Sequence, residues 1–308
     1  MGTWFKCGGL LWVALGAVAC VDPDDHSSHV RDLRVLGIAV ERPELMAPTC
    51  EPTAEALEVL TEQVSYRALL VDPAGQGRSI AYTLTACADP EDSLCEDASK
   101  RVELARGTTT AGELVLPIRP GASQLADGTL LLDAVREADP YQGFGGLRMP
   151  LVLHVTAGEE GVYAQKLMVF TCPLVPGMAP NQQPRLQGLT LDDAAWDAEA
   201  LPELQGQGPF VVRANDISAL EESYVVPGFR KEAVQLKESW AITWHATLGK
   251  FSVEETESVE FNGQPGRHRT EWEPPEKDGV AQEVTFWAVV RDGRGGSSWL
   301  VRRARWTP

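Results

Sequence analysis

The sequence predicts an all-β protein built from two tandem antiparallel β-sandwiches. Short runs of alternating apolar and polar residues recur from residue 33 onward, separated by turns rich in Gly, Pro, Asn and Asp. Short strands at such spacing favour antiparallel sandwiches. A proline-rich segment interrupts the alternation at 174–184, and 308 residues are enough for two domains of ordinary size.

The first nineteen residues indicate an export signal. The uncharged run from Cys7 to Ala19 follows one basic residue, Lys6, and is shorter than the roughly 20 residues that span a bilayer. Small residues at 17–19 precede Cys20, and this arrangement resembles the lipobox of bacterial lipoproteins, although Ala17 replaces the usual leucine. The resemblance implies a lipoprotein signal peptide at 1–19 and diacylglycerol on Cys20. An ordinary cleavable signal followed by an incidental cysteine is the alternative.

An acidic segment, 20–31, follows the signal and is expected to be a short flexible tether, because it offers little apolar surface to bury. Its carboxylates and histidines are competent metal ligands, but ordering a mobile tether around an ion costs chain entropy. We therefore expect no metal and no cofactor. The net charge of −17 disfavours nucleic acid and anionic membrane surfaces as partners, so membrane contact is expected through the N-terminal lipid alone.

The first domain is expected at 32–173. At 64–70, apolar Val64, Tyr66 and Leu70 alternate with polar residues before the turn that Asp72 begins. The other expected strands are 33–40, 80–86, 113–118, 147–156 and 162–171, with a brief helix at 130–138.

Four cysteines remain after Cys20, an even number that suggests two disulfides in an exported chain. Cys87 and Cys95 bracket a turn-rich loop that can bring its ends together, which leaves Cys50 to pair with Cys172. Closing the second, much longer loop stabilises a fold by about 5 kcal/mol in the chain-entropy model. A zinc site is the alternative, but there is no Cys-x-x-Cys spacing and histidine is scarce.

The segment 174–184 is expected to be a domain linker, stiffened because proline restricts φ. The second domain is then expected at 185–308, with a strand rhythm close enough to the first to suggest weak internal duplication. Its expected strands are 185–191, 210–213, 239–247, 268–272, 283–291 and 298–306.

Three patterns in the second domain carry a family resemblance: Trp240-Ala-Ile-Thr-Trp244, Thr270-Glu-Trp-Glu-Pro-Pro275 and Asp292-Gly-Arg-Gly-Gly296. They resemble the later strands of bacterial immunoglobulin-like, cadherin-like and polycystic-kidney-disease-type domains. The resemblance implies a core tryptophan at Trp240 or Trp244. In the last pattern Asp292 can accept bonds from the N–H groups of its own turn, while its glycines supply positive φ. The whole arrangement is also similar to uncharacterised envelope lipoproteins of Gram-negative gliding bacteria, which implies a cell-envelope address and no activity.

No nucleophile elbow, zinc-protease helix, phosphate loop or dinucleotide fingerprint is present, so we expect no enzyme. We expect a lipid-anchored binding, scaffolding or adhesion module at the outer membrane, whose partner is an envelope protein or a glycan. Two alternatives remain open. One is an accessory or catalytic subunit of an envelope enzyme with an unrecognised site. The other is a calcium-dependent adhesin, using carboxylates at Asp72, Asp192, Asp193, Asp216 or Asp292.

Trp287, Trp299 and Trp306 are the candidate binding residues, because not all seven tryptophans of the second domain can enter one core. Exposed aromatic rings stack on sugars or anchor protein partners. The alternative is that the rings cap the sandwich or pack between the domains. Arg302, Arg303 and Arg305 could also stack over Trp299 or Trp306 as cation–π pairs.

Overall fold

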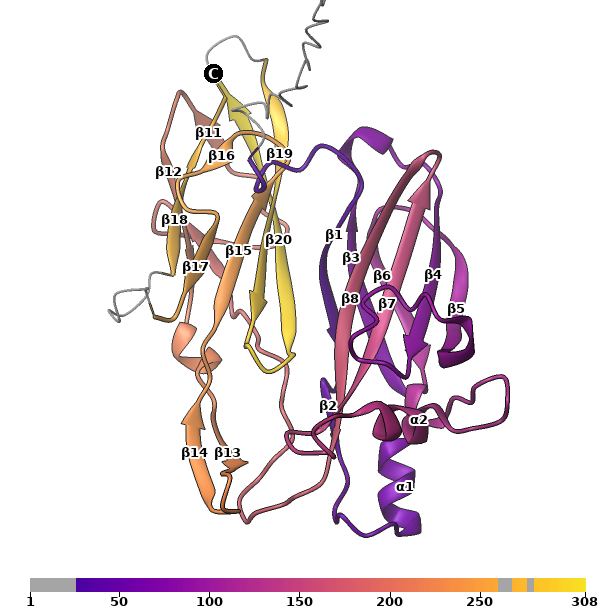
Figure 1. The fold of residues 1–308 in the computed structure, drawn as a ribbon. Helices are drawn as coiled ribbons and strands as arrows, with labels where there is room; N and C mark the ends of the chain where they lie inside the picture. Colours follow the sequence, from indigo (N-terminus) through magenta and orange to yellow (C-terminus); the bar gives the residue numbers. More distant parts are fainter. Residues whose placement is uncertain (1–25, 260–267, 276–279) are drawn as a thin grey trace, which may run out of the picture.

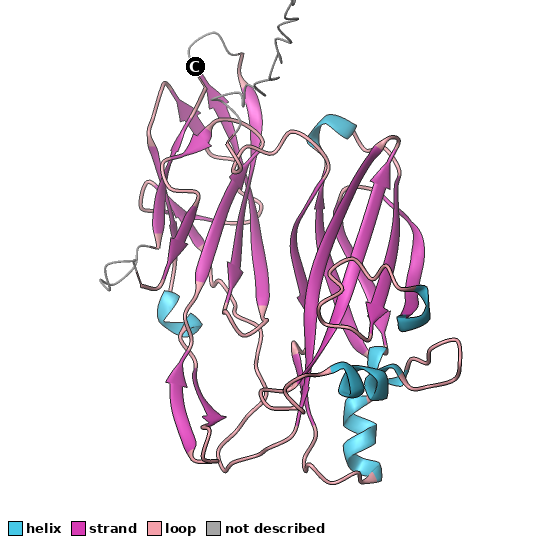
Figure 2. Ribbon diagram, viewed as in Figure 1, coloured by secondary structure: helices cyan, strands magenta, loops and turns pink. Residues whose placement is uncertain are grey.

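The computed structural model describes residues 26–259, 268–275 and 280–308, and it shows two β-sandwiches side by side (Figure 1). Strands dominate both, and the helices are few and short (Figure 2). The expected signal peptide at 1–19 and the lipidation site Cys20 lie outside the described residues. In the part of the chain that is described, no helix is both long and apolar enough to cross a membrane.

Domain 1 contains two facing sheets. The first has the order β1-β3-β6 and the second the order β2-β8-β7-β4-β5. The chain switches sheets between β1 and β2, which pairs in parallel with the end of β8. The strands are β1 (Arg34–Val40), β2 (Glu44–Met46), β3 (Val64–Val71), β4 (Ile80–Cys87), β5 (Arg101–Thr109), β6 (Gly112–Ile118), β7 (Leu147–Ala157) and β8 (Glu160–Thr171).

Two short helices close the lower end of domain 1 in Figure 1. The helix expected at 130–138 is present as α2 (Leu131–Ala138). The sequence interpretation missed α1 (Ala54–Leu60), whose first turn is capped by the Thr53 hydroxyl accepting from the Ala56 N–H. It also missed the edge strand β5.

Domain 2 has sheets of order β10-β9-β12-β18-β16 and β11-β20-β19-β15-β17. A separate hairpin, β13 (Ser223–Pro227) with β14 (Ala233–Lys237), projects from it (Figure 1). The remaining strands are β9 (Leu189–Leu191), β10 (Ala194–Trp196), β11 (Glu203–Gln205), β12 (Phe210–Ala214), β15 (Ala241–Ala246), β16 (Lys250–Phe251), β17 (Glu255–Glu257), β18 (Arg269–Glu273), β19 (Gln282–Arg291) and β20 (Ser297–Thr307).

The two domains repeat one topology. The order β2-β8-β7-β4-β5 corresponds to β11-β20-β19-β15-β17, and β1-β3-β6 corresponds to β9-β12-β18. In both, a three-residue strand pairs in parallel with the end of the last strand of its domain. This arrangement is that of an immunoglobulin-like sandwich, so the all-β fold class with two such domains is confirmed.

Each sandwich has its own core. The core of domain 2 is rich in tryptophan, and Trp240, Trp244, Trp272 and Trp306 are among its fully buried side chains. Both predicted disulfides join domain 1 residues: Cys50 bonds Cys172 with 5.0 Å between Cα atoms, and Cys87 bonds Cys95 with 5.6 Å.

Candidate functional site

The outer edge of β1 is covered by donors from domain 2 and the linker. Alternate carbonyls of an edge strand point the same way, and here each of three in succession accepts a side-chain bond. The Leu36 carbonyl accepts from Arg291 Nη2 at 3.2 Å. The Ile38 carbonyl accepts from the Ser297 hydroxyl, and the Val40 carbonyl accepts from the Gln183 side chain.

An apolar cluster lies beside this edge and joins the two domains. Trp299 packs so closely on β1 that a Cβ at Gly37 would lie 3.0 Å from its ring. The Arg67 guanidinium stands 5.0 Å from the Trp299 ring centre, as a cation–π pair. The buried members of the cluster are Val30, Leu36, Leu69, Val71, Trp287 and Val289.

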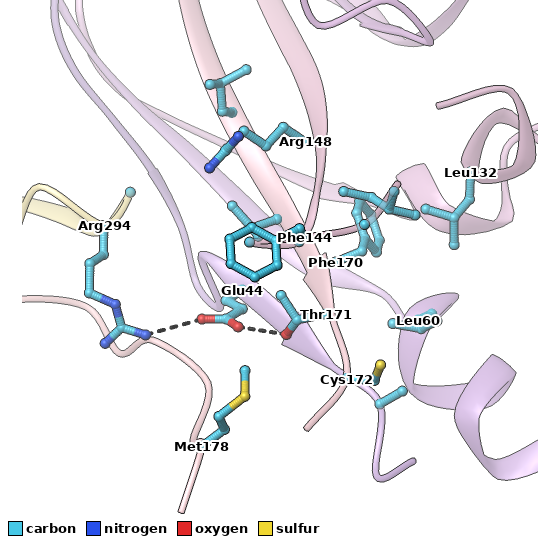
Figure 3. Close-up of a pocket in the computed structure, with 18 of the residues that line it drawn as sticks. Glu44, Leu60, Leu132, Phe144, Arg148, Phe170, Thr171, Cys172, Met178 and Arg294 are labelled. Atoms are coloured by element: carbon cyan, nitrogen blue, oxygen red, sulfur yellow. Dashed lines mark hydrogen bonds and ion pairs between the residues drawn. The ribbon is translucent and has the colours of Figure 1, made fainter. Parts of the chain in front are cut away.

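Below the apolar cluster, a buried polar network links domain 1, the linker and domain 2. The Glu44 carboxylate accepts from the Thr171 hydroxyl at 2.6 Å and the Asn181 N–H at 2.9 Å, and pairs with Arg294 at 3.3 Å (Figure 3). Arg294 also pairs with Glu238 at 2.8 Å. A buried pair is costly to break from one side only, because the remaining charge is then left uncompensated.

Asp292 organises the turn between β19 and β20. Its carboxylate accepts from the Arg294 and Gly296 N–H groups, both at 2.8 Å, as the sequence predicted, and also from the Asn181 amide at 2.9 Å. Gly293 and Gly295 have positive φ, but Gly296 does not. Gly296 is needed for a different reason: a Cβ there would collide with the Asp292 carboxylate and the Pro184 ring.

The N-terminal strap, residues 26–30, lies on domain 2 before the chain enters domain 1. The Val30 N–H donates to the Ala246 carbonyl at 2.8 Å, and the Ala246 N–H donates to the Ser28 carbonyl at 2.9 Å. The Ser28 hydroxyl donates to Glu254, and Ser28 and Val30 are buried. This part of the expected flexible tether is therefore held in place, because Val30 supplies apolar surface and the end of β15 offers free backbone groups.

A cleft with a volume of about 1240 Å³ opens between the domains below this interface. Most of its wall is apolar and comes from segments far apart in the sequence. Figure 3 shows Phe144, Phe170 and Leu132 of domain 1 facing Met178 of the linker, with Arg294 of domain 2 at the edge. The Cys50–Cys172 disulfide lies in the same wall.

The hairpin β13–β14 forms part of the cleft boundary. Tyr224 of β13 lines the cleft and lies under the Arg294 guanidinium, 4.1 Å from the ring centre. At the hairpin tip, Phe229 stacks on Phe144 of domain 1 with 5.9 Å between ring centres. Phe229 is 97% exposed, so this ring pair lies at the surface and buries almost none of the Phe229 side chain.

The cleft carries more positive than negative charge, in contrast to the whole chain. Five basic and three acidic residues line it, whereas the net charge of the chain is −17. Among the described residues, no carboxylate forms an ion pair with Arg148, Lys166 or Arg291. Lys166 donates to the Gly295 carbonyl across the domain interface, and burial lowers the pKa of its ammonium to about 8. Such groups favour a negatively charged ligand.

The three tryptophans predicted to bind a ligand occupy other positions. Trp306 is 0% exposed in the core of domain 2, and its N–H donates to the Gly206 carbonyl at 2.9 Å, so it presents no face to a ligand. Trp287 and Trp299 pack between the domains, which was the alternative. The cation over Trp299 is Arg67, and Arg302 instead donates to the Trp196 carbonyl.

The aspartates considered for calcium do not converge. Asp72 pairs with Arg78 at 2.7 Å, and Asp193 pairs with Arg213 at 3.0 Å. Asp192 accepts from the Val211 N–H, and Asp216 accepts from the Ser218 hydroxyl. Throughout the described ranges, no group of three His, Cys, Asp or Glu residues is placed to hold a metal ion.

Sequence reasoning missed the cleft. Its basic residues come from α2, β7, β8 and the β19–β20 turn region, which no local motif connects. One usable signal was present: Lys166 occupies an inward-facing position of an otherwise apolar alternation, between Ala164 and Met168.

No protein-family model and no curated protein matches the sequence. The chain is similar in structure to red sea bream transglutaminase (11% identity, covering 90% of this chain and 32% of that chain, TM-score 0.25). It is also similar to Escherichia coli alpha-2-macroglobulin activated by porcine elastase (8% identity, covering 91% of this chain and 22% of that chain, TM-score 0.26). A third similar structure is that of the two tandem V-type regions of a v-region-containing chitin binding protein (8% identity, covering 89% of this chain and 100% of that chain, TM-score 0.24). The chain spans a third or less of the first two, and similarities this weak carry no inference about activity or ligand.

Proposed function

We propose that this chain is a lipid-anchored, non-enzymatic binding protein of the cell envelope, which holds an anionic, partly apolar partner in the cleft between its domains. One observation carries the proposal: basic residues outnumber acidic residues in the wall of a largely apolar cleft, although the chain as a whole is strongly acidic. Binding sites typically combine an apolar wall with a few charged groups that fix orientation.

The interface between the domains supports a cleft that exists before the partner arrives. The β1 edge, the cluster around Trp299 and the network around Glu44 hold the domains together from three sides. Binding to a preformed cleft costs less free energy, because fewer side chains and loops must be ordered when the partner binds. The resemblance of 234–306 to cadherin-like and polycystic-kidney-disease-type modules also favours recognition over catalysis.

Photo-crosslinking in native envelopes tests the site. A photoreactive amino acid at Phe144, on the cleft wall, should label a discrete partner, and Arg148→Glu should suppress the label by charge repulsion. The matched control places the same amino acid at Val115, which is exposed on β6, the strand of its sheet farthest from domain 2. Identical products from both positions, or labelling insensitive to Arg148→Glu, would contradict the proposal.

Mass spectrometry of the mature N-terminus tests the anchor separately. Diacylglycerol on Cys20 is the expected result. A free amine at a residue after Cys20 would exclude lipid anchoring and leave the binding proposal untouched.

A further inference from the structure

One edge of β8, at the cleft, has backbone groups that pair with no other strand. The short strand β2 pairs only with Val169–Thr171, at the end of β8. The preceding residues pair with β7 on one side, and no strand of the described ranges pairs with them on the other. Eight residues of an ordered strand, 161–168, therefore have one unpaired side.

The register of β2 shows which groups point outward. The Val169 N–H donates to the Pro43 carbonyl, and the Thr171 carbonyl accepts from the Ala47 N–H. Odd-numbered residues therefore direct their backbone groups to this edge, and the next in line are Leu167, Gln165 and Tyr163. All three are exposed, and within the described chain no hydrogen bond reaches their backbone from outside the β7–β8 pair.

The neighbouring edge of β1, which faces the same domain interface, is closed. Its carbonyls at residues 36, 38 and 40 are all occupied by side chains of domain 2 and the linker. The β19–β20 turn reaches only the end of the free stretch, where a Cβ at Gly295 would lie 3.9 Å from the Leu167 carbonyl. Gln165 and Leu167 also line the cleft, so the free edge faces the proposed binding space.

The charges along this edge are positive. Lys166 lies between Gln165 and Leu167 in the strand. Arg148 on β7 is directly opposite Val169, so its side chain lies on the same face of the sheet as that of Val169. Figure 3 shows Arg148 above Phe144 at the same cleft wall. A segment lying along β8 would therefore meet cations at its edge and on its outer face.

We propose that β8 receives an extended acidic segment of a partner protein as an added strand, continuing the line of β2. This rests on the cleft being the binding site. Three outward-facing residues accommodate a strand of about five residues, at about 3.3 Å per residue. Strand addition supplies main-chain hydrogen bonds that a glycan or lipid headgroup does not match, while alternate side chains of the segment provide specificity.

Selection of peptides from a random library against the purified full-length chain tests the proposal. The selected peptides should be enriched in Asp and Glu and should compete with labelling at Phe144. Methylation of alternate backbone nitrogens should weaken binding at least tenfold, since it removes strand donors without altering the protein. On binding, amide exchange should slow at Tyr163, Gln165 and Leu167, with little change at residues 164 and 166, which already face β7.

Variants of Gln165 provide a second arm. Gln165→Pro removes an outward N–H and should abolish binding, whereas Gln165→Ala keeps the N–H and should bind as the parent does. Should Gln165→Pro fail to fold, the methylated peptides carry the test alone. Selected peptides that tolerate methylation, or that lack acidic residues, would overturn strand addition.

The outcomes separate the two proposals. Failure to select any peptide, together with a crosslinked partner at Phe144, would overturn strand addition and leave the cleft proposal standing. Failure of both experiments would overturn both.

Discussion

Strands β8 and β20 hold the same position in the two domains, yet their free edges differ. In domain 2 the Arg303 carbonyl accepts from the Trp196 indole at 3.2 Å, and the Val301 carbonyl accepts from Arg302 Nη1 at 2.8 Å. In domain 1, β2 covers the end of the corresponding edge and the β19–β20 turn approaches it at Leu167, while no bond within the described residues reaches the backbone of Gln165 or Tyr163 from outside the β7–β8 pair. Open strand edges invite pairing with other chains. One topology thus occurs once with its edge closed and once with its edge open, and the open copy lines the cleft.

The largest expected difference between the two domains comes from removing the disulfide that follows β8, which destabilises domain 1 alone. The doubly substituted Cys50→Ala/Cys172→Ala chain should lose about 5 kcal/mol of domain 1 stability, because it opens a loop of 122 residues. Cys87→Ala/Cys95→Ala opens a loop of 8 and should cost about 2.5 kcal/mol. Calorimetry should show domain 2 retaining its transition. Equal losses from the two pairs would contradict the loop-length argument.

Removing a hydrogen bond from the covered edge of β20 tests whether the edges of β20 and β8 differ. Trp196→Phe removes the indole donor and some buried volume, and should cost domain 2 about 2–3 kcal/mol in denaturant unfolding. Tyr163→Phe on β8 is the matched control: it keeps the ring stacked on His154 and should change stability by less than about 0.5 kcal/mol. Comparable losses for the two variants would show that the edges are not differently sealed.

The linker glutamine that covers β1 provides a smaller test. Gln183 donates to the Val40 carbonyl and accepts from the Ser297 N–H at 2.7 Å, so Gln183→Ala should cost about 1–2 kcal/mol and loosen the interface. Small-angle scattering should report a larger radius of gyration. The exposed neighbour, as Gln182→Ala, should change neither quantity, and equal effects from both would contradict the role of Gln183.

The smallest expected effect concerns pH. Burial lowers the pKa of Lys166 to about 8, so the free protein loses this cation as pH rises through 8. Affinity for an acidic peptide should therefore fall above pH 8, by at most tenfold per pH unit, and Lys166→Met should flatten the profile. The sign for folding is opposite: the ammonium is disfavoured in the folded state, so stability should rise between pH 8 and 10.5. An affinity that rises above pH 8 would contradict the role of Lys166.

More of the fold than of the candidate site could be predicted from the sequence. Strand alternation, the cysteine pairing and the Asp292 turn were predictable because each depends on nearby residues or on elimination among four cysteines. The three-residue strands β2 and β11 were not, because their partners lie more than a hundred residues away. Trp287 and Phe286 lie on opposite faces of β19, and only the packing of the two domains makes the face of Trp287 an interior one. The hairpin β13–β14 was also missed, although Gly228 marks its turn.

The position of the N-terminal strap decides which end of the body would face a membrane anchored through Cys20. It lies at the end of domain 2 opposite the hairpin β13–β14 and the helices that border the cleft (Figure 1). Only five residues lie between Cys20 and His26, so the two are at most about 20 Å apart along the chain. With a lipid on Cys20, the body is kept close to the bilayer. The free stretch of β8 then begins on the bilayer side, where Glu160 pairs with Arg78, and the hairpin and helices that border the cleft lie on the far side.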